Sequence, residues 1–241
     1  IFRGLIIPLF FIAIPMGLII QQPDLGTGMI LLFLFMSMLY LTNVKLRYIV
    51  ILTLLVILPM PFVWHLLKDY QKDRLLVFLN PNIDPLGAGY TVIQSKIAIG
   101  SGGFFGRGWL SGTQSQLRFL PEAHTDFIFS IAGEELGFLT TFLILVAFIV
   151  LFISMLRLAK QVEDPFGKSL IFATAFSITY YALINAAVCV GLGPVTGLPM
   201  PFISKSGSQL LINLALIGIC LNIVKQSQHK LQKQAEYLHE L

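Results

Sequence analysis

Long stretches without a charged side chain are the feature that most limits how this chain can fold. There are six of them, at 4–23, 25–44, 48–67, 136–156, 169–204 and 206–224. A helix needs roughly 20 mainly apolar residues to cross the hydrocarbon core of a bilayer, and five stretches have about that length. The remaining stretch fits one helix at about 169–190 followed by a Gly/Pro-rich segment. Because backbone in lipid must satisfy its own hydrogen bonds, we predict an all-α integral membrane protein, a bundle of six transmembrane helices.

The composition supports a membrane protein and argues against a soluble one. Hydrophobic residues make up 56% of the 241 residues and charged residues 12%, whereas soluble domains average roughly 25% charged residues. Two cysteines cannot build a disulfide framework, and no Cys/His cluster indicates zinc. We expect membrane lipids as neighbours and no nucleic-acid partner.

The cations predict the orientation of the spans. With the N-terminus in the cytoplasm, nine cations fall on the inner side: Arg3, Lys45, Arg47, Arg157, Lys160, Lys168, Lys225, Lys230 and Lys233. The positive-inside rule therefore places both ends in the cytoplasm, including a tail at 225–241, and places 68–126 and 191–205 outside. We interpret the polar tail as a cytoplasmic surface helix. The sequence starts with Ile1 and enters the membrane almost at once, which suggests a piece of a longer protein.

The predicted outer segment 68–126 contains several short elements. Its charged beginning, which includes Lys72, Asp73 and Arg74, is typical of a solvated or headgroup-facing helix end. Tyr90, Ile93 and Ile97 have helical spacing and predict a short amphipathic helix at the membrane surface. The glycine-rich stretch 100–108 fits either an anion-binding nest or a re-entrant turn.

Backbone breaks indicate a cavity that opens outward. The sequence Leu-Pro-Met-Pro-Phe occurs at 58–62 and again at 198–202, and it should interrupt helical hydrogen bonding at both places. Unwound backbone at membrane depth is tolerated only beside protein or water.

Three acidic residues are candidates for chemistry in or near that cavity. Asp126 directly precedes an apolar run, so it is either the N-cap of a helix or a functional carboxylate. Glu134 and Glu135 lie two turns further on, where an intramembrane acid is a functional candidate. Their alternative role is a salt bridge or hydrogen bond to neighbouring helices. Asn185 lies within a span, and we expect it to hold helices together.

Cations on the outer side provide candidates for binding phosphate: Lys96, Arg107, Arg118 and Lys205. An Arg fork matches phosphate oxygens, and a Lys supplies a compact charge. Contact with anionic lipid headgroups is the alternative role. These residues and Asp126 suit a substrate that carries a phosphate and a hydroxyl.

Several motifs resemble the SEDS family (shape, elongation, division and sporulation proteins). They are Pro23-Asp-Leu-Gly-Thr27, Gln94-Ser-Lys-Ile-Ala-Ile-Gly-Ser-Gly-Gly103, Leu120-Pro-Glu-Ala-His-Thr-Asp-Phe-Ile-Phe129, Gly133-Glu-Glu-Leu-Gly137 and Pro201-Phe-Ile-Ser204. Within the family, the stretches 84–90 and 106–114 are more similar to RodA, of elongation, than to FtsW, of division. The family usually has Ser-Tyr-Gly-Gly-Ser-Ser where this chain reads Ser204-Lys-Ser-Gly-Ser-Gln209, a departure that bears on loop flexibility and on partner or substrate contacts.

The resemblance implies a peptidoglycan glycosyltransferase that polymerises lipid II into glycan strands outside the bacterial cytoplasmic membrane. It also implies that the six spans are the last six of about ten, and that a class B penicillin-binding protein is the partner. Asp126 matches the family's essential outer carboxylate, and the resemblance makes Glu122, His124 and Thr125 of the same motif candidates for binding the substrate.

The mechanism expected from the resemblance uses Asp126 as general base toward the acceptor sugar's 4-hydroxyl. Undecaprenyl pyrophosphate leaves with inversion, and its charge is neutralised by the outer cations or by a divalent cation such as Mg²⁺ or Mn²⁺. Two alternatives stay open at this point. One is a transporter that flips lipid II, and the other is a non-catalytic scaffold that activates the penicillin-binding protein.

Overall fold

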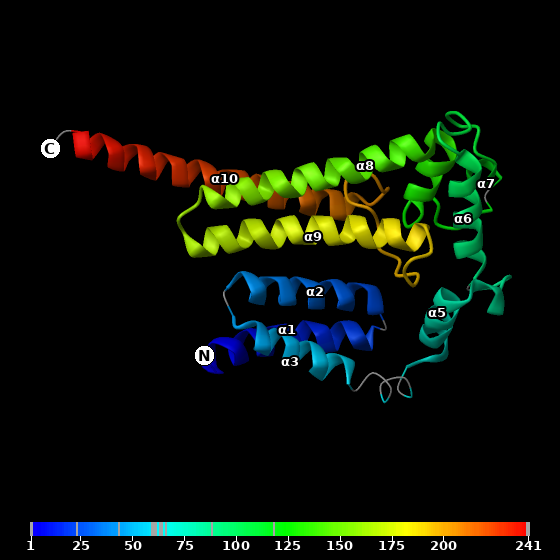
Figure 1. Ribbon diagram of the computed structural model, residues 1–241, viewed down its shortest axis with the longest axis horizontal. Helices are drawn as coiled ribbons and strands as arrows, with labels where there is room; N and C mark the ends of the chain where they lie inside the picture. The colour runs from blue at the N-terminus through cyan, green and yellow to red at the C-terminus, as the bar shows by residue number, and fades with distance from the viewer. Residues whose placement is uncertain are drawn as a thin grey trace.

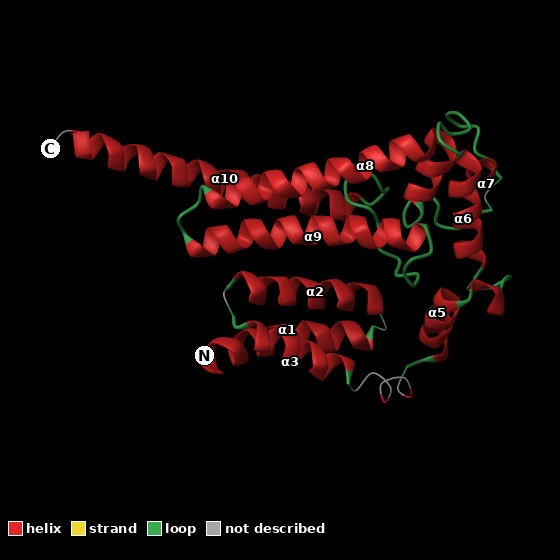
Figure 2. Cartoon of the chain, in the orientation of Figure 1, coloured by secondary structure: helices red, strands yellow, loops and turns green. Residues whose placement is uncertain are grey.

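The computed structural model describes residues 2–22, 24–42, 44–58, 62, 65, 67–87, 89–117 and 119–239, and their regular elements are all helices. No strand occurs in these ranges (Figure 2). The elements are α1 (Phe2–Gln21), α2 (Leu25–Leu41), α3 (Leu46–Ile57), α5 (Asp69–Leu79), the 3-10 helix η1 (Pro81–Ile83), α6 (Tyr90–Gly102), α7 (Thr113–Gln116), α8 (Ile128–Lys160), α9 (Pro165–Cys189) and α10 (Gly207–His239). The predicted all-α class is confirmed.

The long helices run side by side along one axis, with α9 at the centre (Figure 1). Helix α9 contacts α8, α10, α2 and α6, while α1 and α3 pack against α2. The start of α1 and the end of α10 lie at one end of the bundle, and α5, α6 and α7 are gathered at the opposite end (Figure 1). The residues predicted as an outer segment therefore lie far from both chain ends. Orientation relative to a membrane stays a prediction.

Apolar helices coincide with the predicted spans. Three helical stretches of the described chain are long and apolar enough to cross a membrane: Ile128–Lys160, Pro165–Val190 and Gly207–Lys230. Shorter apolar stretches lie in the first three helices, at Pro8–Ile19, Gly26–Leu41 and Leu46–Leu55. The chain is a multi-pass membrane protein, and the count of six spans stays a prediction.

Two acids near the starts of charge-free stretches, Asp24 and Asp164, act as helix caps. The Asp24 carboxylate accepts hydrogen bonds from Thr27 N at 3.0 Å and Thr27 Oγ1 at 2.6 Å at the start of α2. The Asp164 carboxylate accepts from Gly167 N at 2.7 Å at the start of α9. Each cap satisfies N–H groups that the first helical turn leaves without a partner.

Helix α6 is present as predicted, and its small residues face α8. The side chains of Val92, Ser95 and Ala98 are buried, while Ile97 is 46% exposed on the other side. A Cβ on Gly102 would overlap the carbonyl oxygen of Gly133 in α8, so the two backbones touch. Membrane contact of the Ile97 side stays a prediction.

Helix α8 is interrupted at Gly137, whose φ of 80° and ψ of −176° are not helical. The break removes the helical bonds from Phe138 N to Glu134 O and from Leu139 N to Glu135 O. The loop after α6 supplies substitutes. Phe138 N donates to Gly103 O at 2.9 Å and Leu139 N to Phe104 O at 3.2 Å, while Arg107 N donates to Glu134 O and Gly108 N to Glu135 O, each at 3.0 Å.

The glycines at 100–108 thus serve close backbone packing against the break in α8. Gly106 has a φ of 83°, and a Cβ there would overlap the Glu135 carbonyl. Of the two sequence-based interpretations, the turn agrees with this structure. The loop amides donate to protein carbonyls instead of forming an anion nest.

The polar tail continues α10 directly. The helix runs without interruption from Gly207 to His239 and extends beyond the rest of the bundle (Figure 1). Ser227 Oγ and Gln228 Nε2 donate to Gln161 O and Oε1 at 3.2 and 2.9 Å, which fixes the tail's first turn to the end of α8. The predicted helicity of 225–239 is confirmed. Of the two Leu-Pro-Met-Pro-Phe copies, 198–202 is non-helical as expected, and the helix-breaking part of the other copy, 59–61, lies outside the described residues.

Candidate functional site

A chain of turns before α8 carries Asp126, and Glu122 organises it. Glu122 has a positive φ of 50°. Its carbonyl oxygen accepts from the backbone N–H groups of Thr125, Asp126 and Phe127 at 3.2, 3.0 and 3.3 Å, and its carboxylate accepts from Thr125 Oγ1 at 3.0 Å. Helix α8 begins after Phe127 with no side-chain cap. The helix-cap interpretation of Asp126 is therefore wrong.

Three successive backbone carbonyl oxygens of this turn accept hydrogen bonds from residues outside the turn. Asn185 Nδ2 in α9 donates to Asp126 O and to Leu198 O, both at 2.7 Å. Ser204 Oγ donates to Thr125 O at 2.6 Å, and Lys205 N donates to His124 O at 2.9 Å. Because Asn185 is only 1% exposed, its two hydrogen bonds join α9, the segment at 198 and the Asp126 turn in a buried position. Sequence reasoning gave Asn185 a helix-joining role, and the structure adds Asp126 to what it joins.

The Asp126 side chain borders a cavity of about 380 Å³ formed by four parts of the chain. Its lining residues are Tyr70, Asp73, Arg74, Gly87, Thr91, Pro121, Glu122, Asp126, Phe127 and Val195. A Cβ on Gly197 would lie 3.6 Å from Asp126 Oδ2, so the non-helical segment after α9 passes beside the carboxylate. This cavity brings the outer segment and the predicted break at 191–204 together.

Burial raises the pKa of the Asp126 carboxyl above its ordinary value of 3.8, and the nearby Glu122 charge raises it further. The hydrogen bond from Thr125 and the charge of Arg74 act in the opposite direction and lower the pKa. The net effect makes Asp126 a stronger base than an exposed aspartate.

Arg74 is the functional candidate that sequence reasoning missed. It lines the Asp126 cavity, its guanidinium carbon lies 5.8 Å from the centre of the Tyr70 ring, and its Nη1 donates to Val195 O at 3.4 Å. The sequence offered only a charged helix end at this position. Its approach to Val195, far along the chain, depends on tertiary folding.

The predicted cations do not gather around Asp126. The exposed Lys96 side chain reaches the backbone at Gly191. Arg107 donates from Nε to Ser101 O and from Nη1 to Thr113 Oγ1, both at 3.1 Å, and so fixes its own loop. Lys205 is exposed and contacts the Asp126 turn through its backbone, and Arg118 lies outside the described residues. Among described residues lining the Asp126 cavity, Arg74 is the single Lys or Arg.

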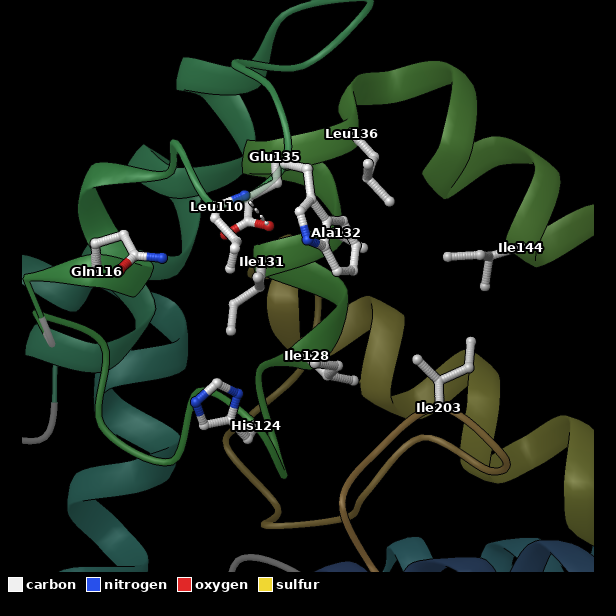
Figure 3. Close-up of a pocket in the computed structure, with 11 residues that line it drawn as sticks. Leu110, Gln116, His124, Ile128, Ile131, Ala132, Glu135, Leu136, Ile144 and Ile203 are labelled. Atoms are coloured by element: carbon white, nitrogen blue, oxygen red, sulfur yellow. Dashed lines mark hydrogen bonds between the residues drawn. The ribbon is translucent and has the colours of Figure 1, made fainter.

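His124 faces a second cavity of about 640 Å³ on another side of the turn (Figure 3). Trp109, Leu110, Ile144 and Ile203 are among its mostly apolar lining residues. The predicted site residues are therefore divided. Glu122 and Asp126 line one cavity and His124 the other, while the Thr125 hydroxyl bonds Glu122.

The two acids in α8 have structural partners. Glu134 is fully buried, and its Oε1 accepts from Gln114 N at 2.9 Å and Thr113 Oγ1 at 3.2 Å. Glu135 Oε2 accepts from Leu110 N at 3.1 Å (Figure 3). Both carboxylates fasten the 107–116 stretch to α8, which agrees with the hydrogen-bonding alternative.

The predicted divalent cation stays a prediction. Among the described residues, three His, Cys, Asp or Glu side chains nowhere come together as metal ligands.

Comparison with known proteins agrees with the motifs. Residues 2–229 match the FtsW/RodA/SpoVE family of cell cycle proteins. The chain belongs to this family. The peptidoglycan glycosyltransferase MrdB of Escherichia coli K12 is 42% identical over 218 residues, which are 90% of this chain and 59% of MrdB. A probable peptidoglycan glycosyltransferase FtsW of Trichlorobacter lovleyi is 43% identical over 210 residues, 86% of this chain and 54% of that protein.

Among solved structures, this member of the FtsW/RodA/SpoVE family resembles a chain from work on the structural coordination of polymerization and crosslinking by a peptidoglycan synthase complex. The TM-score is 0.75 at 28% identity, over 91% of this chain and 61% of that chain. The chain thus spans about three fifths of the length of these relatives. The SEDS resemblance stated from the motifs is confirmed.

Proposed function

We propose that the full-length protein is a peptidoglycan glycosyltransferase that polymerises lipid II during cell elongation. The observation that carries this proposal is the Asp126 carboxylate. It caps no helix and borders a cavity built from α5, α6, its own turn and the segment after α9. Its relatives MrdB and FtsW, a peptidoglycan glycosyltransferase and a probable one, support the reaction type. RodA-like stretches at 84–90 and 106–114 favour elongation over division.

In the proposed reaction, Asp126 accepts the proton of the acceptor sugar's 4-hydroxyl as that oxygen attacks the anomeric carbon of the donor. The bond from the anomeric carbon to the pyrophosphate oxygen breaks, the pyrophosphate keeps the bonding electrons, and the configuration inverts. The raised pKa of Asp126 suits this role, because a base acts best when its pKa approaches the working pH. General-base assistance of this kind contributes roughly 10²- to 10⁴-fold in rate.

The test is glycan-strand synthesis from purified lipid II by the full-length protein with the change Asp126→Asn. The amide keeps the shape and cannot accept the proton, so we expect a rate loss of roughly 10²-fold or more. Asp69→Asn is the matched control, since Asp69 lies at the start of α5 with a fully exposed side chain and should leave synthesis unchanged. Full synthesis by Asp126→Asn would exclude the general-base role.

The variant Asp126→Asn also distinguishes a glycosyltransferase from a lipid II flippase. Flipping requires no deprotonation of a hydroxyl, so reconstituted flipping should survive Asp126→Asn where polymerisation does not. Flipping without any synthesis by the wild type would replace the glycosyltransferase proposal.

We further propose a class B penicillin-binding protein as partner, with lipid II as substrate and the 68–126 end of the bundle outside the cytoplasmic membrane. The likeness to a chain from a peptidoglycan synthase complex supports this pairing. The departure at 204–209 does not by itself favour a non-catalytic scaffold, because Ser204 still holds Thr125 O and Lys205 adds only an exposed side chain. Partner binding without glycan synthesis by the complete protein would favour the scaffold.

A further inference from the structure

The Asp126 cavity has an unbalanced set of charges for a substrate that carries phosphate. Three acids line it, Asp73, Glu122 and Asp126, together with one described cation, Arg74. A phosphate entering among three carboxylates is repelled unless a cation receives it. The predicted phosphate-binding candidates Lys96 and Arg107 lie elsewhere, against Gly191 and within the loop after α6. Among the described residues, any attraction for an anion inside this cavity therefore centres on Arg74.

Arg74 is oriented in a way that suits this task. The Tyr70 ring, one helical turn earlier in α5, lies 5.8 Å from the guanidinium carbon. On another side, Nη1 donates to Val195 O at 3.4 Å, which directs the guanidinium toward the segment after α9. The cation–π contact and one weak backbone bond restrict the planar group, and four of its five N–H donors make no hydrogen bond to the described residues.

The helix that carries Arg74 is fixed at its start. Lys68 N donates to Gln71 Oε1 at 3.0 Å, and Gln71 is buried against the rest of the protein. Helix α5 also contacts η1, which precedes α6. The guanidinium is thus presented by a helix of eleven residues whose first turn is anchored.

We propose that Arg74 binds the phosphate group of a lipid-linked pyrophosphate in the cavity that Asp126 borders. The inference rests on the proposed function, because that function supplies a pyrophosphate substrate. In this arrangement Asp126 accepts the proton of the attacking hydroxyl, and Arg74 receives the negative charge that grows on the departing pyrophosphate. A planar guanidinium is well matched to this task, since two parallel N–H groups can bind two phosphate oxygens at once.

The experiment measures binding of farnesyl pyrophosphate to the full-length protein in phosphatidylcholine nanodiscs. The variants are Arg74→Gln, Arg74→Lys and the control Lys72→Gln. Lys72 lies on the same helix, pairs with Asp69 at 3.7 Å and does not line the cavity. We expect Arg74→Gln to weaken binding about tenfold or more, as for loss of a charge-assisted pair. The affinity of Arg74→Lys should lie between those of the wild type and Arg74→Gln, because Lys keeps the charge and lacks the planar pair of N–H groups. Lys72→Gln should bind like the wild type.

Thermal melting separates binding from folding. Farnesyl pyrophosphate should raise the melting temperature of the wild type and of Lys72→Gln, and should do so much less for Arg74→Gln. Binding by Arg74→Gln within twofold of the wild type would overturn the proposal. The proposal would also be overturned if Arg74→Gln bound farnesyl pyrophosphate with unchanged affinity while the acid limb of its glycan synthesis moved to higher pH. Arg74 would then act only through its charge effect on Asp126.

A second set of nanodiscs distinguishes substrate from membrane lipid. If Arg74→Gln loses phosphatidylglycerol retention while keeping farnesyl pyrophosphate affinity, Arg74 is a headgroup contact and the proposal is wrong. The proposed function fails separately. If the wild type binds farnesyl pyrophosphate through Arg74 but makes no glycan, the binding site stands and the polymerase proposal is refuted. If Arg74→Gln makes glycan with an unchanged KM, the polymerase proposal stands and the binding site is refuted.

Discussion

Replacing Asn185 by Leu tests how the position of Asp126 is maintained. Leu has nearly the same shape as Asn and lacks the amide donors. In the structure, Asn185 Nδ2 donates to Asp126 O and Leu198 O, both at 2.7 Å, from a side chain that is 1% exposed. A buried carbonyl that loses its donor costs about 1–3 kcal/mol. Leu198 O is buried, whereas Asp126 O is half-buried and also accepts from Cys189 Sγ at 3.7 Å, so we predict a loss of roughly 1–3 kcal/mol in the free energy of unfolding.

The matched control is Asn213→Leu. Asn213 is similarly buried, at 7% exposure, yet its Nδ2 has no hydrogen-bond partner in the described structure. Removing that amide should be neutral or stabilising, because an unsatisfied buried donor is lost. SDS-induced unfolding of the full-length protein in mixed micelles measures both variants. Equal losses in the two variants, or a loss below about 1 kcal/mol for Asn185→Leu, would refute this account of the Asp126 turn.

The remaining predictions concern the loop after α6 and the titration of Asp126. Gly106→Ala should lower the unfolding free energy by about 1–3 kcal/mol from its positive φ alone, with added loss because the new Cβ overlaps the Glu135 carbonyl. Gly100→Ala, a helical position with open space around it, should instead raise it by about 1 kcal/mol. Thermal melting distinguishes them, and equal effects would contradict the packing argument. Since burial and then Glu122 raise the pKa of Asp126 above 3.8, the acid limb of glycan synthesis should lie above that value, and Glu122→Gln should move it to lower pH. If the acid limb of Glu122→Gln lies at the same pH as that of the wild type, the Glu122 charge does not raise the pKa of Asp126. The raised pKa also means that the Asp126 contribution to stability decreases as pH rises from 3.8 through the folded-state pKa.

The helices were predictable because charges and caps coincide with their ends. Asp24 begins α2 through its own carboxylate, so a gap between charges marks a helix boundary for a physical reason. Asp164 does the same for α9. The motif around Asp126 marks it as a candidate, but the sequence alone leaves it as either a helix cap or a functional carboxylate. The start of α8 without a side-chain cap decides between the two.

The charge environment of Asp126 could not be predicted in the same way. Arg107 lies within the glycine-rich stretch 100–108, and its side chain fixes that loop. Arg74 lies near the opposite end of the outer segment 68–126 from Asp126, yet it lines the same cavity because α5 folds back toward Val195. Distance along the chain carries no information about such a return, so the sequence could not single out Arg74, and phosphate binding by Lys96, Arg107 and Lys205 stays a prediction.

The break in α8 has a consequence for the spacing of residues along the chain. Gly103 and Phe104 accept from the backbone N–H groups of Phe138 and Leu139, while Arg107 and Gly108 donate to the carbonyl oxygens of Glu134 and Glu135. The order of these partners is fixed, much as two neighbouring strands pair in register. A one-residue insertion or deletion between 103 and 108 would shift one half of these bonds relative to the other, even if every glycine were kept. The number of residues in this loop is therefore under as strict a constraint as their identity, and length variation should be tolerated only outside the paired positions.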